Sequence, residues 1–137
     1  MKVNFLLAIV CIITAFIACD NDDPVSYDYH AHIMQPSSAD KHMGDILFIQ
    51  VEFESHTGEA VEHANVRIYN KTTQTVIYSE PDDPHVGGGS DYEFHDQIEL
   101  SAANGFSAGD WVIEATVWGE DEGQDLVRET IEFTILP

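Results

Sequence analysis

Apolar and polar side chains alternate along most of the chain beyond residue 27. The clearest stretch follows residue 46, where Leu47, Ile49, Val51 and Phe53 are separated by single residues that are mostly polar. Successive side chains of a β-strand point to opposite faces, so a period of two indicates a strand with one face buried and one face in water. Further runs of this kind occupy residues 66–69, 92–100, 111–118 and 130–135, with shorter ones at 27–34 and 75–78. The pattern predicts seven strands.

The segments between these runs are rich in residues that form turns. They lie at residues 43–45, 57–59, 70–72, 81–90, 104–110 and 119–123. No stretch of ten or more residues has the 3.6-residue period of an amphipathic helix. Because seven strands in roughly 110 residues match the size of an immunoglobulin domain, we expect residues 27–137 to form an all-β, seven-stranded immunoglobulin-like β-sandwich.

The last two predicted strands carry a resemblance to a known domain type. The segment from Ala108 to Val117, an acidic turn and the segment from Arg128 to Ile135 together resemble the final hairpin of fibronectin type III and bacterial immunoglobulin-like domains. The cysteine pair of antibody domains is absent from residues 27–137, and the expected core tryptophan, Trp111, starts the sixth strand. The resemblance implies a fold and says little about activity.

The N-terminal segment has a different character. Lys2 precedes a nearly unbroken apolar run of fourteen residues that ends at Ala18, shorter than the roughly 20 that a membrane-spanning helix needs. We therefore predict a cleaved signal peptide at residues 1–18 and an acidic tether at residues 19–26. The four residues that end at Cys19 (Phe-Ile-Ala-Cys) resemble a bacterial lipobox, which implies that Cys19 becomes the lipidated N-terminal residue.

The residues directly after Cys19 are Asp-Asn-Asp-Asp. This acidic cluster resembles the surface-export signal of Bacteroidota lipoproteins. The resemblance implies attachment to the outer membrane through the N-terminal lipid, with the domain at the cell surface. A periplasm-facing domain is the alternative, in which the cluster is only a solvated tether.

Composition limits the function classes. The chain has 137 residues, 25 Asp and Glu against five Lys and Arg, and a net charge of −20. Such a charge repels the phosphates that supply most nucleic-acid affinity, so DNA and RNA are excluded as partners. The length fits one small domain, and neither a Walker-type phosphate loop nor a Gly-x-Ser-x-Gly nucleophile elbow occurs. We therefore expect a binding protein that is not an enzyme and has no organic cofactor.

Histidine supplies the candidate functional chemistry. His30, His32 and Met34 occupy alternate positions of one predicted strand and therefore share a face. Imidazole and carboxylate suit zinc or copper(II), and a thioether extends the range to copper(I). In an immunoglobulin-like arrangement six of the seven histidines fall at or near one end, with His42 at the other. The candidate metal ligands at this end are His30, His32, Met34, His56, His63, His85 and His95.

Within this set we expect His30 and His32 to bind the ion directly and His63 or His95 to complete the site. The combination is similar in architecture and ligand type to CopC-like exported proteins, which are small β-sandwiches with His and Met ligands at one end. Calcium is a weaker alternative, because no EF-hand spacing accompanies the acidic residues that could hold it. Those residues are Asp82, Asp83, Asp91, Glu120, Asp121, Glu122 and Asp125.

A second function class stays open. The domain could be a protein-interaction or structural module of a surface assembly, with another envelope protein as its partner. Tyr69, Trp118 and Phe48 fall on the outward positions of their predicted strands. Packing against neighbouring segments explains these aromatic residues as well as binding does. Metal content after purification separates the two functions.

Overall fold

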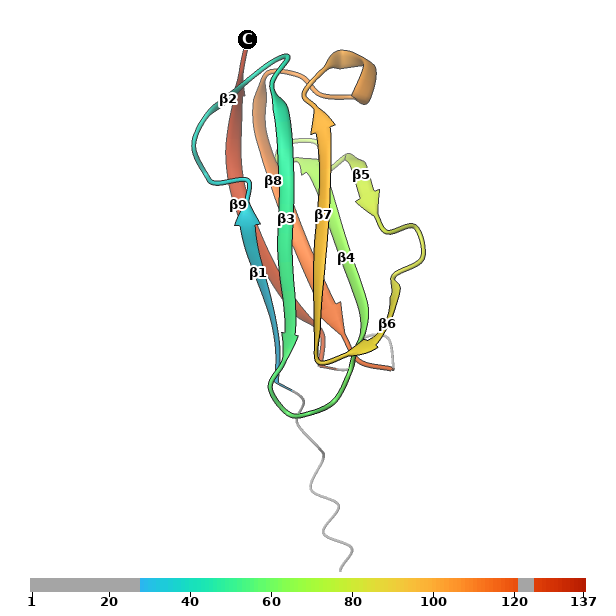
Figure 1. Cartoon of the computed structure of the whole chain (residues 1–137). Helices are drawn as coiled ribbons and strands as arrows, with labels where there is room; N and C mark the ends of the chain where they lie inside the picture. Colours follow the sequence, from blue (N-terminus) through green and yellow to red (C-terminus); the bar gives the residue numbers. More distant parts are fainter. Residues whose placement is uncertain (1–27, 121–124) are drawn as a thin grey trace, which may run out of the picture.

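The computed structural model describes residues 28–120 and 125–137, and within them the chain forms two β-sheets packed face to face (Figure 1). One sheet has the order β1 (Tyr29–Gln35), β3 (Ile46–Ser55) and β7 (Asp91–Glu99). The other has the order β2 (Lys41–His42), β9 (Val127–Leu136), β8 (Gly109–Trp118), β4 (Val61–Asn70) and β5 (Val76–Glu80), and β6 (His85–Gly89) also pairs with β4. A single turn of 3₁₀ helix, η1 (Ala102–Asn104), connects β7 to β8.

This arrangement confirms the expected all-β sandwich. The first, second and fifth of the predicted strands form one sheet, and the third, fourth, sixth and seventh form the other. In a constant-type immunoglobulin domain the fourth strand belongs to the first of these sheets, so its place differs here. All pairings within the two sheets are antiparallel except the short contact between β2 and β9. The connections between strands therefore gather at the two ends of the sandwich.

The number of strands is higher than predicted, because two short strands escape a search for alternation. β2 has two residues, too few to show any period, and pairs in parallel with the end of β9. β6 lies inside the segment predicted as a turn, where Gly87 and Gly88 have φ of +96° and +80°. Its pairing with β4, not its composition, makes it a strand.

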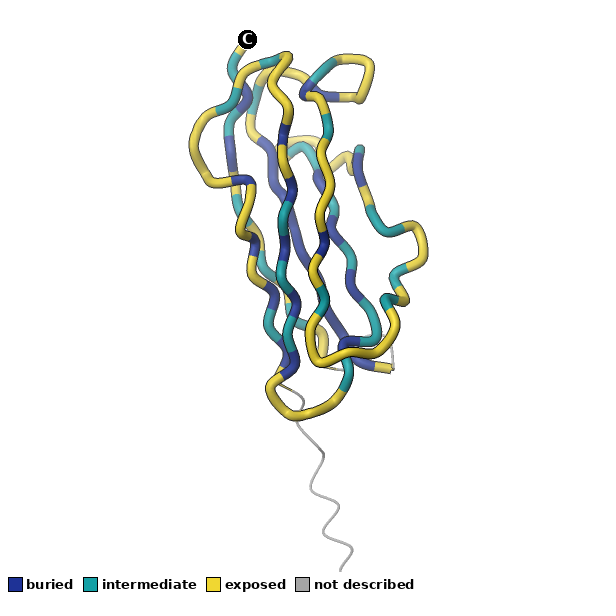
Figure 2. The backbone as a smooth tube through the Cα atoms, viewed as in Figure 1, coloured by how far each residue is buried: buried dark blue, intermediate teal, exposed yellow. Residues whose placement is uncertain are grey.

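The core consists of the predicted inward positions of both sheets. Figure 2 shows buried positions concentrated along the facing strands, with exposed ones at the loops. Trp111 is 2% exposed and packs against Phe106, with ring centres 5.0 Å apart. The other fully or almost fully buried side chains include Leu47, Ile49, Val51, Phe53, Val66, Ile68, Leu100, Ile113, Val117 and Ile135.

The strand β8 departs from the expected pattern, since every residue from Trp111 to Trp118 is buried. β8 lies between β9 and β4, and side chains of the neighbouring strands cover its outward positions. Glu114 is covered by two arginines, and Trp118 stacks on His63. Alternation predicted that these outward residues would be in water, and it fails for β8 because side chains of β4 and β9 cover them.

One hydrogen bond joins the two sheets along an open side of the sandwich. The Tyr78 hydroxyl of β5 donates to Asp96 Oδ2 of β7 at 2.6 Å. Burial of the ring, followed by this bond to a carboxylate, raises the pKa of Tyr78 well above its usual value of 10.0. The phenol therefore stays protonated and ties β5 to β7.

The predicted signal peptide, the tether and Cys19 lie outside the described residues, as do Asp121 and Glu122. Among the residues that the structure does describe, no helix has the length and apolar character needed to cross a membrane.

Candidate metal centre

The first strand pair positions a group of metal-binding side chains. In the antiparallel ladder of β1 and β3, His30 lies opposite Glu54 and Tyr29 opposite Ser55. The His56 N–H donates to the Asp28 carbonyl oxygen at 2.9 Å, which continues the pairing by one more residue at the end of the sandwich. Alternation then places the side chains of Asp28, His30, Glu54 and His56 on the same outer face.

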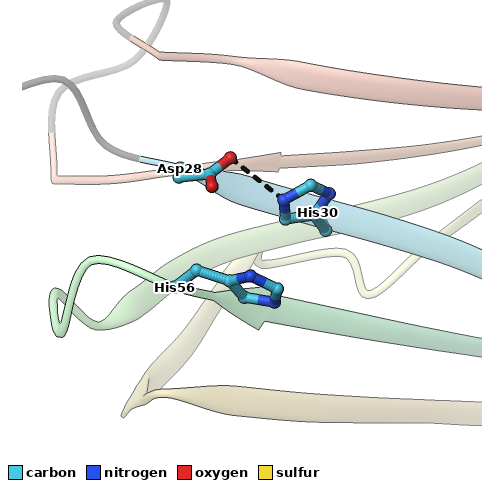
Figure 3. Close-up of side chains that lie close together, drawn as sticks. All are labelled: Asp28, His30 and His56. Carbon is cyan, nitrogen blue, oxygen red and sulfur yellow. Dashed lines mark ion pairs between the residues drawn. The ribbon is translucent and has the colours of Figure 1, made fainter.

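Asp28, His30 and His56 converge at this end, as Figure 3 shows. Their candidate donor atoms all lie within 4.8 Å of one another. His30 Nε2 is 3.0 Å from Asp28 Oδ1, and the His30 and His56 ring centres are 4.5 Å apart. Within residues 28–120 and 125–137 this is the one group of three or more His, Cys, Asp or Glu side chains whose donor atoms all lie within 4.8 Å of one another.

The spacing suits a bound transition-metal ion. Two donor atoms held at about 2.0–2.1 Å by one zinc ion lie roughly 3 Å apart, the separation of His30 Nε2 and Asp28 Oδ1. The set of two imidazoles and one carboxylate leaves at least one position open for water or another ligand. These side chains are half-exposed to exposed, so an ion reaches them from solvent without any opening of the fold.

Two neighbours extend the group. His56 Nε2 lies 3.1 Å from Glu54 Oε2, so Glu54 either orients this ring or supplies a fourth ligand. The His32 ring is stacked on that of His30, with centres 6.0 Å apart and planes within 5°. Parallel rings at this distance do not aim at a common point, so His32 needs a different rotamer before it can bind the same ion as His30.

The electrostatic surroundings favour a cation. The strands β1, β3 and β7 contain no Lys or Arg, while Glu52, Glu54, Asp91 and Glu93 are among their acidic residues. In the sheet Glu52 lies opposite both His32 and Glu93, and Glu54 lies opposite both His30 and Asp91. This face carries carboxylates with no fixed positive charge on the same three strands to neutralise them.

The remaining predicted ligands do not join this group. His63 and His85 lie in the other sheet, paired with one another across β4 and β6. His95 lies in the middle of β7 opposite Gln50, where its Nε2 is 3.2 Å from Glu93 Oε2. His56, and not His63 or His95, therefore stands beside His30, because its backbone hydrogen bond to Asp28 continues the β1–β3 ladder past the end of β3.

Met34 and His42 are remote from the group. Met34 is 54% exposed and lines a hollow of about 230 Å³ with Ile46 and Phe48 toward the other end of the sheet. His42 belongs to β2, beside the end of β9, where its backbone N–H donates to the Asp45 carboxylate. The placement of His42 at the opposite end agrees with the sequence prediction, whereas the strand carries Met34 away from His30.

The acidic residues considered for calcium have other contacts. The Asp83 carboxylate accepts the backbone N–H of His85 at 3.1 Å, and the Asp91 carboxylate accepts the Ser90 hydroxyl at 3.0 Å. Asp82 lines a groove on the outer face of the larger sheet. In the described part of the chain these carboxylates form no group of three that could share an ion.

That groove has a volume of about 510 Å³ and a charged floor. Glu114 Oε1 lies 2.7 Å from Arg67 Nε and 3.3 Å from Arg128 Nε. His63 and Trp118 form one side of the groove. Of the three outward aromatic residues singled out in the sequence, Trp118 is thus covered and Tyr69 lies under Arg67, while Phe48 is 57% exposed.

Sequence reasoning missed Asp28 and Glu54 as members of the site. Each precedes a histidine by two residues, and Glu93 precedes His95 in the same way. On a strand this spacing puts the carboxylate and the imidazole on one face. The repeated acid-x-His pattern was therefore a usable signal, and the distances of 3.0, 3.1 and 3.2 Å between imidazole nitrogen and carboxylate oxygen agree with it.

Comparison with known proteins identifies the fold and no family. No family model and no curated protein matches the sequence. Two structures of the CARDB domain of a Pyrococcus furiosus protein, one in solution and one a crystal structure in complex with di-metal ions, each align with a TM-score of 0.53. The solution structure is 16% identical to this chain, and the alignment covers 80% of this chain and 95% of the domain. The crystal structure is 14% identical, and the alignment covers 82% of this chain and 90% of the domain.

CopC from Methylosinus trichosporium OB3b aligns over 79% of this chain and 95% of its own length, at 16% identity and a TM-score of 0.42. A TM-score below 0.5 carries no functional weight. The CARDB similarity supports the β-sandwich fold alone.

Proposed function

We propose that this protein is a non-catalytic, exported domain that binds a divalent transition-metal ion through Asp28, His30 and His56. The convergence of their donor atoms within 4.8 Å is the observation that carries the proposal. The three side chains come from the start of β1 and the end of β3, where the hydrogen bond between His56 and Asp28 adds one more pair to the ladder. Their approach therefore depends on the fold and not on sequence proximity alone. A bound ion would tie the start of β1 to the end of β3.

The donor set favours zinc or copper(II). Two imidazole nitrogens and one carboxylate oxygen are ligands for both ions. The distance of Met34 from the group removes the thioether that would favour copper(I). A domain of similar fold, the CARDB domain from Pyrococcus furiosus, is described in complex with di-metal ions, so a sandwich of this shape is able to hold metal.

We extend the proposal to location. A signal peptide at residues 1–18 and a lipid on Cys19 would leave the domain attached to the outer membrane by a short acidic tether. The described residues begin at Asp28, itself a member of the metal group, so the tether would join the domain at the same end as the ion. The site would then face the membrane to which the protein is attached.

Calorimetric titration of the purified protein with zinc(II) and copper(II) tests the metal proposal. The double variant His30→Ala/His56→Ala should lose at least about tenfold in affinity for the site, since it removes both nitrogen donors. His42→Ala is the matched control, because this exposed histidine lies at the other end and should leave the affinity unchanged. Equal affinity in the double variant and the wild type would refute the site.

A second function has one observation in its favour. Met34, Ile46 and Phe48 are 54%, 48% and 57% exposed and line the same hollow. Exposed apolar groups gathered in one place are typical of protein contacts. If this face binds an envelope protein, Phe48→Ser should abolish capture of that protein from membrane extracts and leave metal affinity unchanged; capture by the variant at wild-type levels would exclude this surface.

A further inference from the structure

Two histidines of the larger sheet, His63 and His85, form a second group, separate from the first. His63 in β4 lies directly opposite His85 in β6, and their ring centres are 5.3 Å apart at an angle of 62°. Two imidazoles bound to one tetrahedral ion at about 2.0–2.1 Å have ring centres roughly 5 Å apart. The spacing between the two strands thus already provides the separation that a shared ion requires.

The contacts of His63 fix which nitrogen is available. Its Nδ1 lies 2.9 Å from the Gly119 carbonyl oxygen. A carbonyl oxygen only accepts, so Nδ1 must carry the proton, and in the neutral ring Nε2 keeps its lone pair. The ring is also stacked on Trp118, with centres 5.2 Å apart and planes within 5°. Metal-binding histidines commonly have this support, in which one nitrogen donates to a carbonyl and the other binds the ion.

A carboxylate completes the group through an irregularity of the strand. Glu62 and His63 are neighbours, and in a regular strand their side chains would point to opposite faces. The register of β4 against β6 shifts between Val61 and His63, and Glu62 Oε2 lies 3.8 Å from His85 Nδ1. The extra residues of this irregularity lie in β6, between His85 and Gly89. Both Glu62 and His63 approach His85, and because the three donor atoms do not yet all lie within 4.8 Å of one another, an ion would draw them together by a change of side-chain rotamer.

We propose that His63, His85 and Glu62 form a second site for a divalent transition-metal ion, with His63 binding through Nε2. It shares no residue with the group of Asp28, His30 and His56 and lies on the other sheet. His63 also lines the 510 Å³ groove, which gives an ion a path from solvent. The second site is thus independent of the first.

Tryptophan fluorescence during titration with copper(II) alone tests the second site. The chain has two tryptophans, and Trp118 stacks directly on His63. Trp111 is seven residues away along β8, at roughly 3.3 Å per residue. Copper(II) quenches an adjacent indole, so the ion at His63 should quench Trp118 and leave Trp111 emitting. Trp118→Phe should remove the quenching and leave the amount of bound copper unchanged.

Variants separate this site from the first. His85→Ala, at an exposed position, should raise the copper(II) concentration needed for half of the quenching by at least about tenfold. Glu62→Gln should raise this concentration as well. His30→Ala, which belongs to the first site, should retain full quenching even if the first site binds no metal. Two results would overturn the proposal. In the first, His85→Ala and Glu62→Gln are half quenched at the same copper(II) concentration as the wild type. In the second, micromolar copper(II) does not quench the wild type.

Discussion

Glu114 is a charged side chain that is 4% exposed although it points to the outer face of β8. Arg67 of β4, which lies opposite Glu114, and Arg128 of β9 both approach its Oε1 atom. A carboxylate covered in this way depends on its partners, because removing the charge leaves two guanidinium groups without a counter-ion. The pair of arginines thus explains how an acidic residue is accommodated in a central strand.

We expect Glu114→Gln to lower the free energy of unfolding by about 1–3 kcal/mol. This loss is smaller than that for breaking a fully buried ion pair, because both arginines are partly in solvent. Chemical denaturation at neutral pH measures the change. Glu132→Gln is the matched control, since Glu132 pairs with Lys71 on the surface and its loss should change little. Similar effects of the two substitutions would contradict the role given to Glu114.

At the scale of elements, the strands are predictable where one face is buried and the other is in water. β3 shows this pattern most clearly, with Leu47, Ile49, Val51 and Phe53 buried. The same reasoning fails for β6, whose glycines resemble a turn and whose strand character comes from pairing with β4. The period of apolar residues shows which face of a strand is buried. It does not show which strands are its neighbours, because these come from residues far away in the chain.

The candidate site shows the same limit. The common face of His30 and His32 follows from their spacing. The approach of His56 depends on the register of β1 against β3 and on the extra bond from His56 to Asp28, which a single sequence does not determine. The separation of His63 from His30 follows from the assignment of β4 and β1 to different sheets. The position of these histidines near one end of the sandwich was therefore predictable from the sequence, whereas their division between the two sheets was not.

The link between β5 and β7 gives a prediction for alkaline pH. The folded state raises the pKa of Tyr78, so its contribution to stability is complete below the unfolded pKa of about 10 and declines as the pH rises above that value. Tyr78→Phe should lower the free energy of unfolding by about 1–2 kcal/mol at pH 7 through loss of the bond to Asp96.

Above pH 10 the gap between the wild type and Tyr78→Phe should narrow, because only the wild type loses this contribution. Denaturation curves at pH 7, 9, 10 and 11 measure the gap. Tyr69→Phe serves as the control, since it alters a tyrosine whose ring lies under Arg67 and not between the sheets. A constant gap over the whole range would show that Tyr78 ionises as readily in the folded protein as in the unfolded one.

At the scale of the whole molecule, the proposed lipid anchor would join the domain at Asp28, a member of the metal group. If Cys19 carries the lipid, Cys19→Ser should prevent acylation and release the domain into the soluble fraction. Incorporation of a labelled fatty acid and fractionation of cells measure both effects. Membrane retention of the variant without any label would contradict the lipid anchor and leave the metal proposal unaffected.

The account as a whole depends on an ion held between β1 and β3. Anomalous diffraction from crystals of the zinc-loaded protein, recorded on both sides of the zinc absorption edge, locates such an ion without reference to any variant. We predict a peak bounded by Asp28, His30 and His56, with each donor atom at about 2.0–2.2 Å. Zinc-loaded crystals with these three side chains ordered and no anomalous peak between them would contradict the account.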